Sequence, residues 1–158
     1  MANSEVDVSG EVARAVKLVE GVIEGLGLDP SRLRVEVPGE HSHGWSLMRG
    51  SAPVAVFIRA PRENEDSPLL RVVAPIVKID PASEGALHKR LLELNAHGLG
   101  PCAFGVLHDR VVVVAERRTT DLEPAEVGHL IQHVGAVGDH YDDQLIQSFG
   151  GTRIGDDG

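Results

Sequence analysis

The sequence has few of the features that mark disulfide-bonded, membrane-spanning or secreted proteins. Cys102 is the only cysteine in 158 residues, which excludes an internal disulfide and a zinc site built from several cysteines. No stretch approaches the roughly 20 apolar residues needed to cross a bilayer, and the opening MANSEVDVSGEV lacks the apolar core of a signal peptide. We therefore expect a soluble cytoplasmic protein that has no membrane partner.

Positive charge is also scarce. Asp and Glu number 24 against 15 Lys and Arg, so the formal charge is -9 and nucleic acid is not an expected partner. Apolar residues make up 42% of the chain, which is enough for a hydrophobic core at this length. The sequence predicts a single domain over residues 1–151 and a disordered tail over residues 152–158.

Three stretches show the apolar spacing of amphipathic helices. The first is residues 9–26, where Ser9 is placed to cap the helix. The second runs from Ser83 to about residue 96, and the third begins near Pro124 and carries an apolar stripe to Phe149. Each helix is expected to bury one face against a sheet.

Short apolar runs between these helices predict strands. Residues 32–37 alternate apolar and polar side chains, which indicates a strand at or near a sheet edge. Residues 44–49 and 53–59 are separated by Gly and Ser and favour a hairpin, and residues 103–116 favour another around His-Asp-Arg. The expected fold is α+β with an antiparallel sheet, in the order helix, three or four strands, helix, two strands, helix.

The run LLRVVAPIV, residues 69–77, is apolar on both faces of a strand. Leu70, Val72, Ala74 and Ile76 would form one face, and Leu69, Val73, Pro75 and Val77 the other. Pro75 lacks an N–H group, which predicts a bulge or the unpaired side of an edge strand. The second face needs a cover, either a second copy, a client protein, or the helix from Ser83 crossing over within one monomer.

Two histidine pairs are candidate metal ligands. His41 and His43 lie two residues apart beside Glu40, and His129 and His133 lie four apart on the last predicted helix. These pairs define the alternative function, a metal-binding sensor or metal-dependent enzyme. A polar loop and a polar helix flank explain the same residues without a metal, because neither pair has a third ligand nearby in sequence. We therefore predict no metal and no cofactor.

Other reactive residues also favour structural roles. Cys102 enters an apolar strand, where a thiol is usually a small buried side chain, and no acid is placed to orient a nearby histidine as its base. The segment GDHYDD, residues 138–143, lacks the glycine and closing glutamate of a calcium loop. No catalytic residues are assigned, and the chain is predicted not to be an enzyme.

Several phrases resemble the YbjN family, whose fold is similar to type III secretion chaperones. They are LRVVAPIV, LLELNA, FGVLHDRVVVV and VGDHYDDQLIQSFGG, and the resemblance covers roughly residues 10–151. It implies a non-enzymatic α+β domain with helix, three strands, helix, two strands and helix that commonly forms homodimers and engages other proteins in a chaperone-like or regulatory manner. Eight matching residues are expected to be structural, with Asn95 ending the second helix: Leu94, Asn95, Phe104, Gly105, Tyr141, Asp142, Phe149 and Gly150.

Together these observations predict a homodimeric protein-binding domain, a chaperone or regulator that engages a segment of an unidentified client protein. A structural accessory domain of a larger complex fits the same sequence. Large apolar side chains in excess of core needs are the expected contact residues. They are Trp45, Phe57, Leu69, Val73 and Val77.

Overall fold

Antiparallel strands and helices alternate along the chain. The computed structural model describes residues 2–50 and 52–155. The helices are α1 (Ala2–Gly25), α2 (Pro30–Leu33), α3 (Glu84–His97) and α4 (Pro124–Phe149), with a 3-10 turn at Pro81–Ser83. The strands are β1 (Arg34–Val35), β2 (His43–Arg49), β3 (Ala52–Arg59), β4 (Leu69–Lys78), β5 (Ala103–Leu107), β6 (Arg110–Arg118) and β7 (Thr152–Arg153).

The strands form one sheet in the order β1-β2-β3-β4-β6-β5, with β7 also paired to β4, and all neighbours are antiparallel. The predicted α+β class, both hairpins and the edge position of β1 are confirmed. The element order differs in its short elements, because the structure adds α2 and β7 and gives β1 only two residues. Ser51, part of the predicted hairpin turn, lies outside the described residues.

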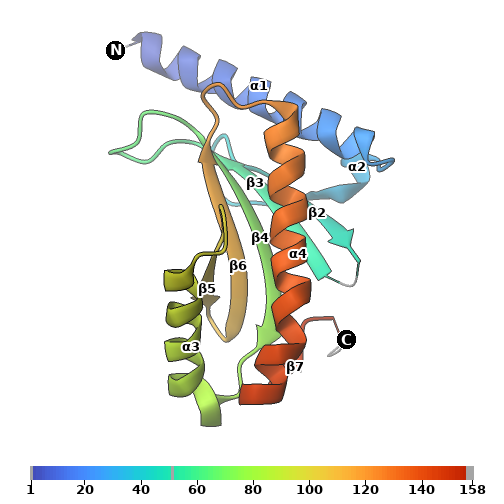
Figure 1. Cartoon of the computed structure of the whole chain (residues 1–158). Coiled ribbons are helices and arrows are strands. Elements are labelled where there is room, and N and C mark those ends of the chain that lie inside the picture. The colour runs from blue at the N-terminus through green and yellow to red at the C-terminus, as the bar shows by residue number, and fades with distance from the viewer. Residues whose placement is uncertain (1, 51, 156–158) are drawn as a thin grey trace.

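The three long helices lie on one side of the sheet (Figure 1). α4 packs along β3, β4 and β6, α1 crosses one end of the sheet against α4 and β3, and α3 packs beside β5 and α4. The inward leucines of α3 join the same core cluster as Phe104 of β5. α3 therefore does not cross to the other face of the sheet, which answers one of the alternatives left open by the sequence.

α1 begins earlier than the sequence predicted. Ser9 lies inside the helix and does not cap it, because no proline or glycine interrupts residues 2–8 and the helix continues through them. The predicted inward face is buried at Val12, Val19 and Ile23. No helix within the described ranges is long and apolar enough to span a membrane.

β4 carries the bulge that Pro75 predicted. The register with β6 shifts between Pro75 and Val77, and the ladder with β3 ends at Val73 while the β7 ladder begins at Val77. The extra residue turns both Ile76 and Val77 toward the core, where they are 3% and 1% exposed. The placement of Val77 on the second face is therefore wrong.

The segment predicted to be a disordered tail is partly ordered. Gly150 and Gly151 adopt φ angles of 74° and 94°, which glycine tolerates best, and they reverse the chain after α4. Thr152–Arg153 then pairs with β4, and Ile154 is buried. A short apolar contact and a strand ladder therefore hold residues 152–154, while residues 156–158 lie outside the described part.

Candidate protein-binding site

Alternation along β3 separates the two faces of the sheet. Val54, Val56 and Ile58 are fully buried under α1 and α4, whereas Ala55 and Phe57 between them are partly exposed. Strand register extends this division to the neighbouring strands. We call the side away from the helices the open face, and its main residues are Ser46, Met48, Pro53, Ala55, Phe57, Leu69, Arg71, Val73, Pro75, Val112 and Val114.

Ion pairs gather at one end of the open face. Arg71 pairs with Glu116 across β4 and β6, and Arg118 pairs with Asp66 at 3.0 Å. Arg59 donates two hydrogen bonds, of 2.7 and 2.9 Å, to the carboxylate oxygens of Glu65 in the β3–β4 loop. These bonds lower the pKa of Glu65 to about 2.

The other end of the open face is apolar. Ala55, Val73 and Val114 form one row across β3, β4 and β6, and Pro75 and Val112 form the next. Val73 and Val112 are buried yet lie outside the main core cluster, which places them on the side that the helices leave uncovered. Small apolar side chains in neighbouring rows suit contact with a partner's sheet, strand or helix.

The five predicted contact residues divide between the two sides. Trp45 and Val77 are 0% and 1% exposed and belong to the core cluster, so they are not surplus apolar surface. Phe57, Leu69 and Val73 lie on the open face, with Val73 at 7% exposure. The role of these residues in protein binding stays a prediction, and only these three of the five lie where a partner could reach them.

A second apolar surface lies on α3 and β5. Leu92 is 69% exposed on the outer side of α3, and Val106 and Leu107 are 40% and 46% exposed at the end of β5, where Val106 points to the helix-covered side and Leu107 to the other. β5 is an edge strand, because it pairs only with β6 among the described strands. Exposed apolar residues along a sheet edge are typical of contact surfaces.

Asn95 hydrogen-bonds backbone groups on the outer edge of β5, a contact that the sequence did not predict. Its side-chain amide donates to the Phe104 carbonyl at 3.0 Å and accepts from the Phe104 N–H at 2.7 Å. Asn95 was expected to end the second helix, but α3 continues to His97. The Gly98 N–H then donates to the Leu94 and Asn95 carbonyls. A single asparagine in a helix that precedes an apolar strand gives no sequence signal for such a contact.

Neither histidine pair gains a third candidate ligand in the described part of the chain. Within residues 2–50 and 52–155, no three side chains of metal-ligating type come together. His133 Nε2 donates to the Leu99 carbonyl at 2.9 Å and stacks on His129, and His43 Nδ1 accepts from Arg34 at 2.8 Å. One ring nitrogen of each pair is thus already occupied by a protein group.

Cys102 and the acidic segment also have structural environments. Burial raises the pKa of the Cys102 thiol to about 11, which disfavours the thiolate that a nucleophile needs. Asp142 is buried beside Arg153, with the two side chains 3.3 Å apart, and burial raises the pKa of this carboxyl. The contact links α4 to β7.

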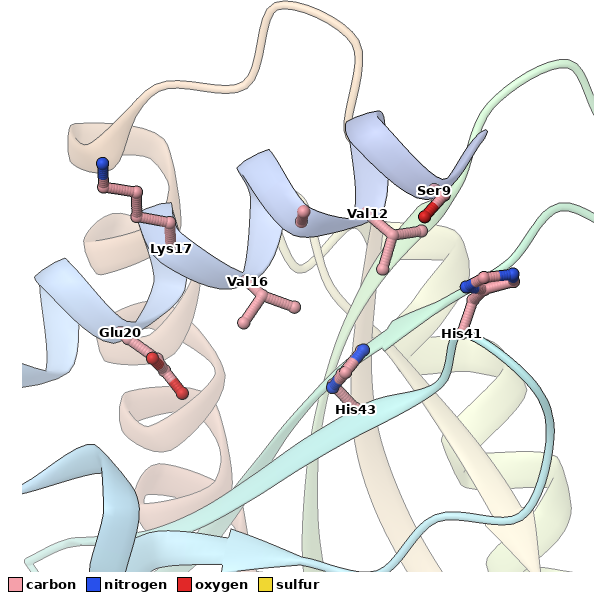
Figure 2. Close-up of a pocket in the computed structure, with 8 residues that line it drawn as sticks. Ser9, Val12, Val16, Lys17, Glu20, His41 and His43 are labelled. Carbon is pink, nitrogen blue, oxygen red and sulfur yellow. The ribbon is translucent and has the colours of Figure 1, made fainter. Parts of the chain in front are cut away.

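A cleft of about 330 Å³ lies between α1 and the start of β2 (Figure 2). α1 contributes Val12, Val16 and Glu20, while His41 and His43 border it from the opposite side. The α1 side of the cleft is mixed, with Ser9, Lys17 and Glu20 beside the two valines, and the opposite side is polar. It is separate from the open face, because α1 packs on the helix-covered side.

Comparisons with known proteins agree with this architecture. Residues 31–157 match the family described as TY-Chap1, T3SS (YopN, CesT) and YbjN peptide-binding chaperone 1. None of the curated protein sequences compared with the chain matches it.

Two solved structures share the fold. The crystal structure of the ExsC-ExsE complex contains a chain that matches with a TM-score of 0.62 and 15% identity, over 85% of this chain and 95% of that one. A chain of the HopA1-SchA chaperone-effector complex matches with a TM-score of 0.54 and 10% identity, over 82% of this chain and 93% of that one.

Proposed function

From the premise that the chain belongs to the TY-Chap1 family of peptide-binding chaperones, we propose that it acts as a homodimer whose open sheet faces hold an extended or helical client segment. Membership confirms the resemblance to the YbjN family. It also confirms the prediction that the chain is not an enzyme, since the family is one of chaperones. The cytoplasmic location and the identity of the client stay predictions.

The observation that carries the proposal is the sheet's one-sided cover. All three long helices pack on one face, and the open face keeps Phe57, Leu69 and the Ala55–Val73–Val114 row without a helix over them. These side chains are only partly exposed, so each contributes a fraction of the roughly 1.5 to 3 kcal/mol of full burial, and a partner segment gains stability by covering several of them at once. HopA1-SchA is a chaperone-effector complex, and an analogous contact with a client is the proposal for this chain.

The α3–β5 surface supports the proposed dimer. Leu92, Val106 and Leu107 place exposed apolar side chains on two neighbouring elements at one edge of the sheet. A two-fold contact between copies would cover this surface on both chains at once. It would leave most of each open face available for the client.

Mass in solution tests the dimer. Light scattering behind a sizing column should give twice the 16.9 kDa of one chain over a wide dilution range. Leu92→Glu should convert this species to a monomer, because it places a charge in the contact. Met48→Glu is the matched control. Met48 is 58% exposed on β2, toward the edge of the sheet far from β5, and its replacement should leave the mass unchanged.

A wild-type mass of one chain at every concentration would refute the dimer. Leu92→Glu separates the dimer from the client site, because Leu92 lies on α3 and not on the open face.

Binding to an immobilised peptide library tests the client site. The wild-type protein should retain a subset of apolar peptides, and Phe57→Ala should lose most of that binding while its thermal unfolding stays cooperative. Leu26→Ala is the control, because Leu26 is 42% exposed at the end of α1 and lies off the open face. Equal binding by both variants would exclude the open face as the client site.

A further inference from the structure

Three side chains from three elements meet beside the α1–β2 cleft. Arg34 of β1 donates to one carboxylate oxygen of Glu20 on α1, from Nε at 3.2 Å and from Nη2 at 2.8 Å. Its Nη1 donates to His43 Nδ1 of β2 at 2.8 Å. The guanidinium also lies over the ring of Trp45, 4.7 Å from the centroid, and Trp45 Nε1 donates to the same Glu20 oxygen at 3.3 Å.

The direction of the Arg34–His43 bond fixes the charge of the imidazole. A guanidinium only donates, so His43 Nδ1 must accept, and the ring carries its single proton on Nε2. A second proton on Nδ1 would remove the acceptor and place an imidazolium against a guanidinium. This geometry agrees with a lowered pKa of His43, caused first by burial and next by the charge of Arg34.

The other titratable groups around His43 do not reverse this effect. Glu20, from α1, raises the pKa of His43, but its carboxylate is already held by Arg34 and Trp45. His41, from the segment before β2, lowers it. β3 presents Ile58 opposite His43, and Lys17 of α1 lines the outer cleft.

We propose that Arg34, Glu20 and His43 form a pH-sensitive latch that holds β1 against α1 and β2, and that protonation of His43 releases β1. β1 has only two residues on β2, so few other hydrogen bonds retain it. Glu20 and His43 also line the cleft, and opening therefore changes its width (Figure 2). The latch goes beyond the proposed function and does not depend on a client or a dimer.

The middle of α1 has an anchor without a histidine. Arg14 donates to the Thr119 carbonyl at 2.7 Å and to Glu11 at 2.7 Å, and Thr119 is fully buried. This anchor joins α1 to the loop before α4, and the hydrogen bond to Glu11 raises the pKa of Arg14, which keeps the guanidinium charged while His43 titrates. Buried Val19 and Ile23 also keep this part of α1 in the core, so opening is confined to β1 and its contacts.

Hydrogen exchange of the wild-type chain measures the latch. Opening takes up one proton, because the free imidazole titrates near 6.5 and the latched one lower. Protection of the β1 amides, corrected for intrinsic exchange, should therefore fall as the pH drops below that value and level off once the latched ring itself titrates. Amides of β4 and β6 should keep their protection.

Variants assign the effect to His43. His43→Gln keeps an acceptor for Arg34 but does not titrate, so β1 protection should become independent of pH between about 5 and 8. His41→Gln is the matched control and should retain the wild-type pH dependence. Trp45, the only tryptophan, reports the same event through the rise in acrylamide quenching that follows opening.

Two results would overturn the latch. One is a His43 ring that titrates at or above 6.5 in an NMR titration of the wild-type chain, a measurement that needs no variant to fold. The other is a pH dependence of β1 exchange that survives in His43→Gln.

Discussion

The two faces of the sheet are built from the same strands yet have different chemistry. On the helix-covered face, Val56 and Val72 lie opposite each other on β3 and β4 with no exposed surface. On the open face, small apolar residues share the surface with the Arg59–Glu65 and Arg71–Glu116 ion pairs. The covered face supplies stability and the open face supplies a surface that stays accessible, so mutations on the two should have different consequences.

Leu70 and Leu69 give the sharpest test of this difference, because they are consecutive residues on opposite faces. Leu70 is fully buried in the core, whereas Leu69 is partly exposed. Leu70→Ala should lower the free energy of unfolding by about 2 to 5 kcal/mol, from lost burial and the cavity left behind. Leu69→Ala should cost about 1 kcal/mol or less. Urea unfolding of both variants measures this, and equal losses would contradict the assignment of faces.

Two glycines of α4 test how closely the helix approaches the covered face. A Cβ at Gly138 would lie 2.9 Å from Ile76 Cγ2, whereas a Cβ at Gly128 would lie 3.9 Å from Val22. Gly138→Ala should lower the stability by about 1 to 2 kcal/mol through overpacking. Gly128→Ala should raise it by up to about 1 kcal/mol, because alanine favours a helix. Thermal unfolding compares the two, and stabilisation by both would show a looser contact.

Variants of Asn95 test how much its side chain stabilises β5, the strand at the edge that both faces share. Asn95→Ala removes both hydrogen bonds to the backbone of Phe104 and should lower the free energy of unfolding by about 1 kcal/mol. It should also speed amide exchange at Phe104. Asn95→Asp is the informative comparison, because it keeps the acceptor but loses the donor, and exchange at Phe104 should remain slower than in the alanine variant.

The smallest expected effect comes from the ion pairs of the open face. The pKa of Glu65 is lowered from 4.5 to about 2, so its stabilising contribution is present above 4.5 and is lost as the pH falls through about 2. Glu65→Gln should flatten the acid dependence of stability over this window. The loss at neutral pH should be small because the pair is exposed to solvent. A carboxylate NMR titration that places Glu65 near 4.5 would contradict the bidentate contact.

Local patterns predicted much of the scaffold. The Pro124 start of α4, both hairpins and the bulge near Pro75 depend on neighbours in sequence, which is why periodicity and turn residues were sufficient. The same reasoning selected Phe57, Leu69 and Val73. It also selected Trp45 and Val77, because apolar side chains that fill a core and those that bind a partner look alike in a sequence.

The composition and local patterns by themselves determined an acidic α+β chain with three amphipathic helices and more two-sided apolar strand than one layer of helices can cover. Tertiary structure decided which side is covered, how the bulge turns Val77 inward, and that β7 returns to β4. It also brought Glu20, Arg34 and His43 together. These outcomes depend on contacts between residues distant in sequence, and their energies arise only when the whole chain has folded.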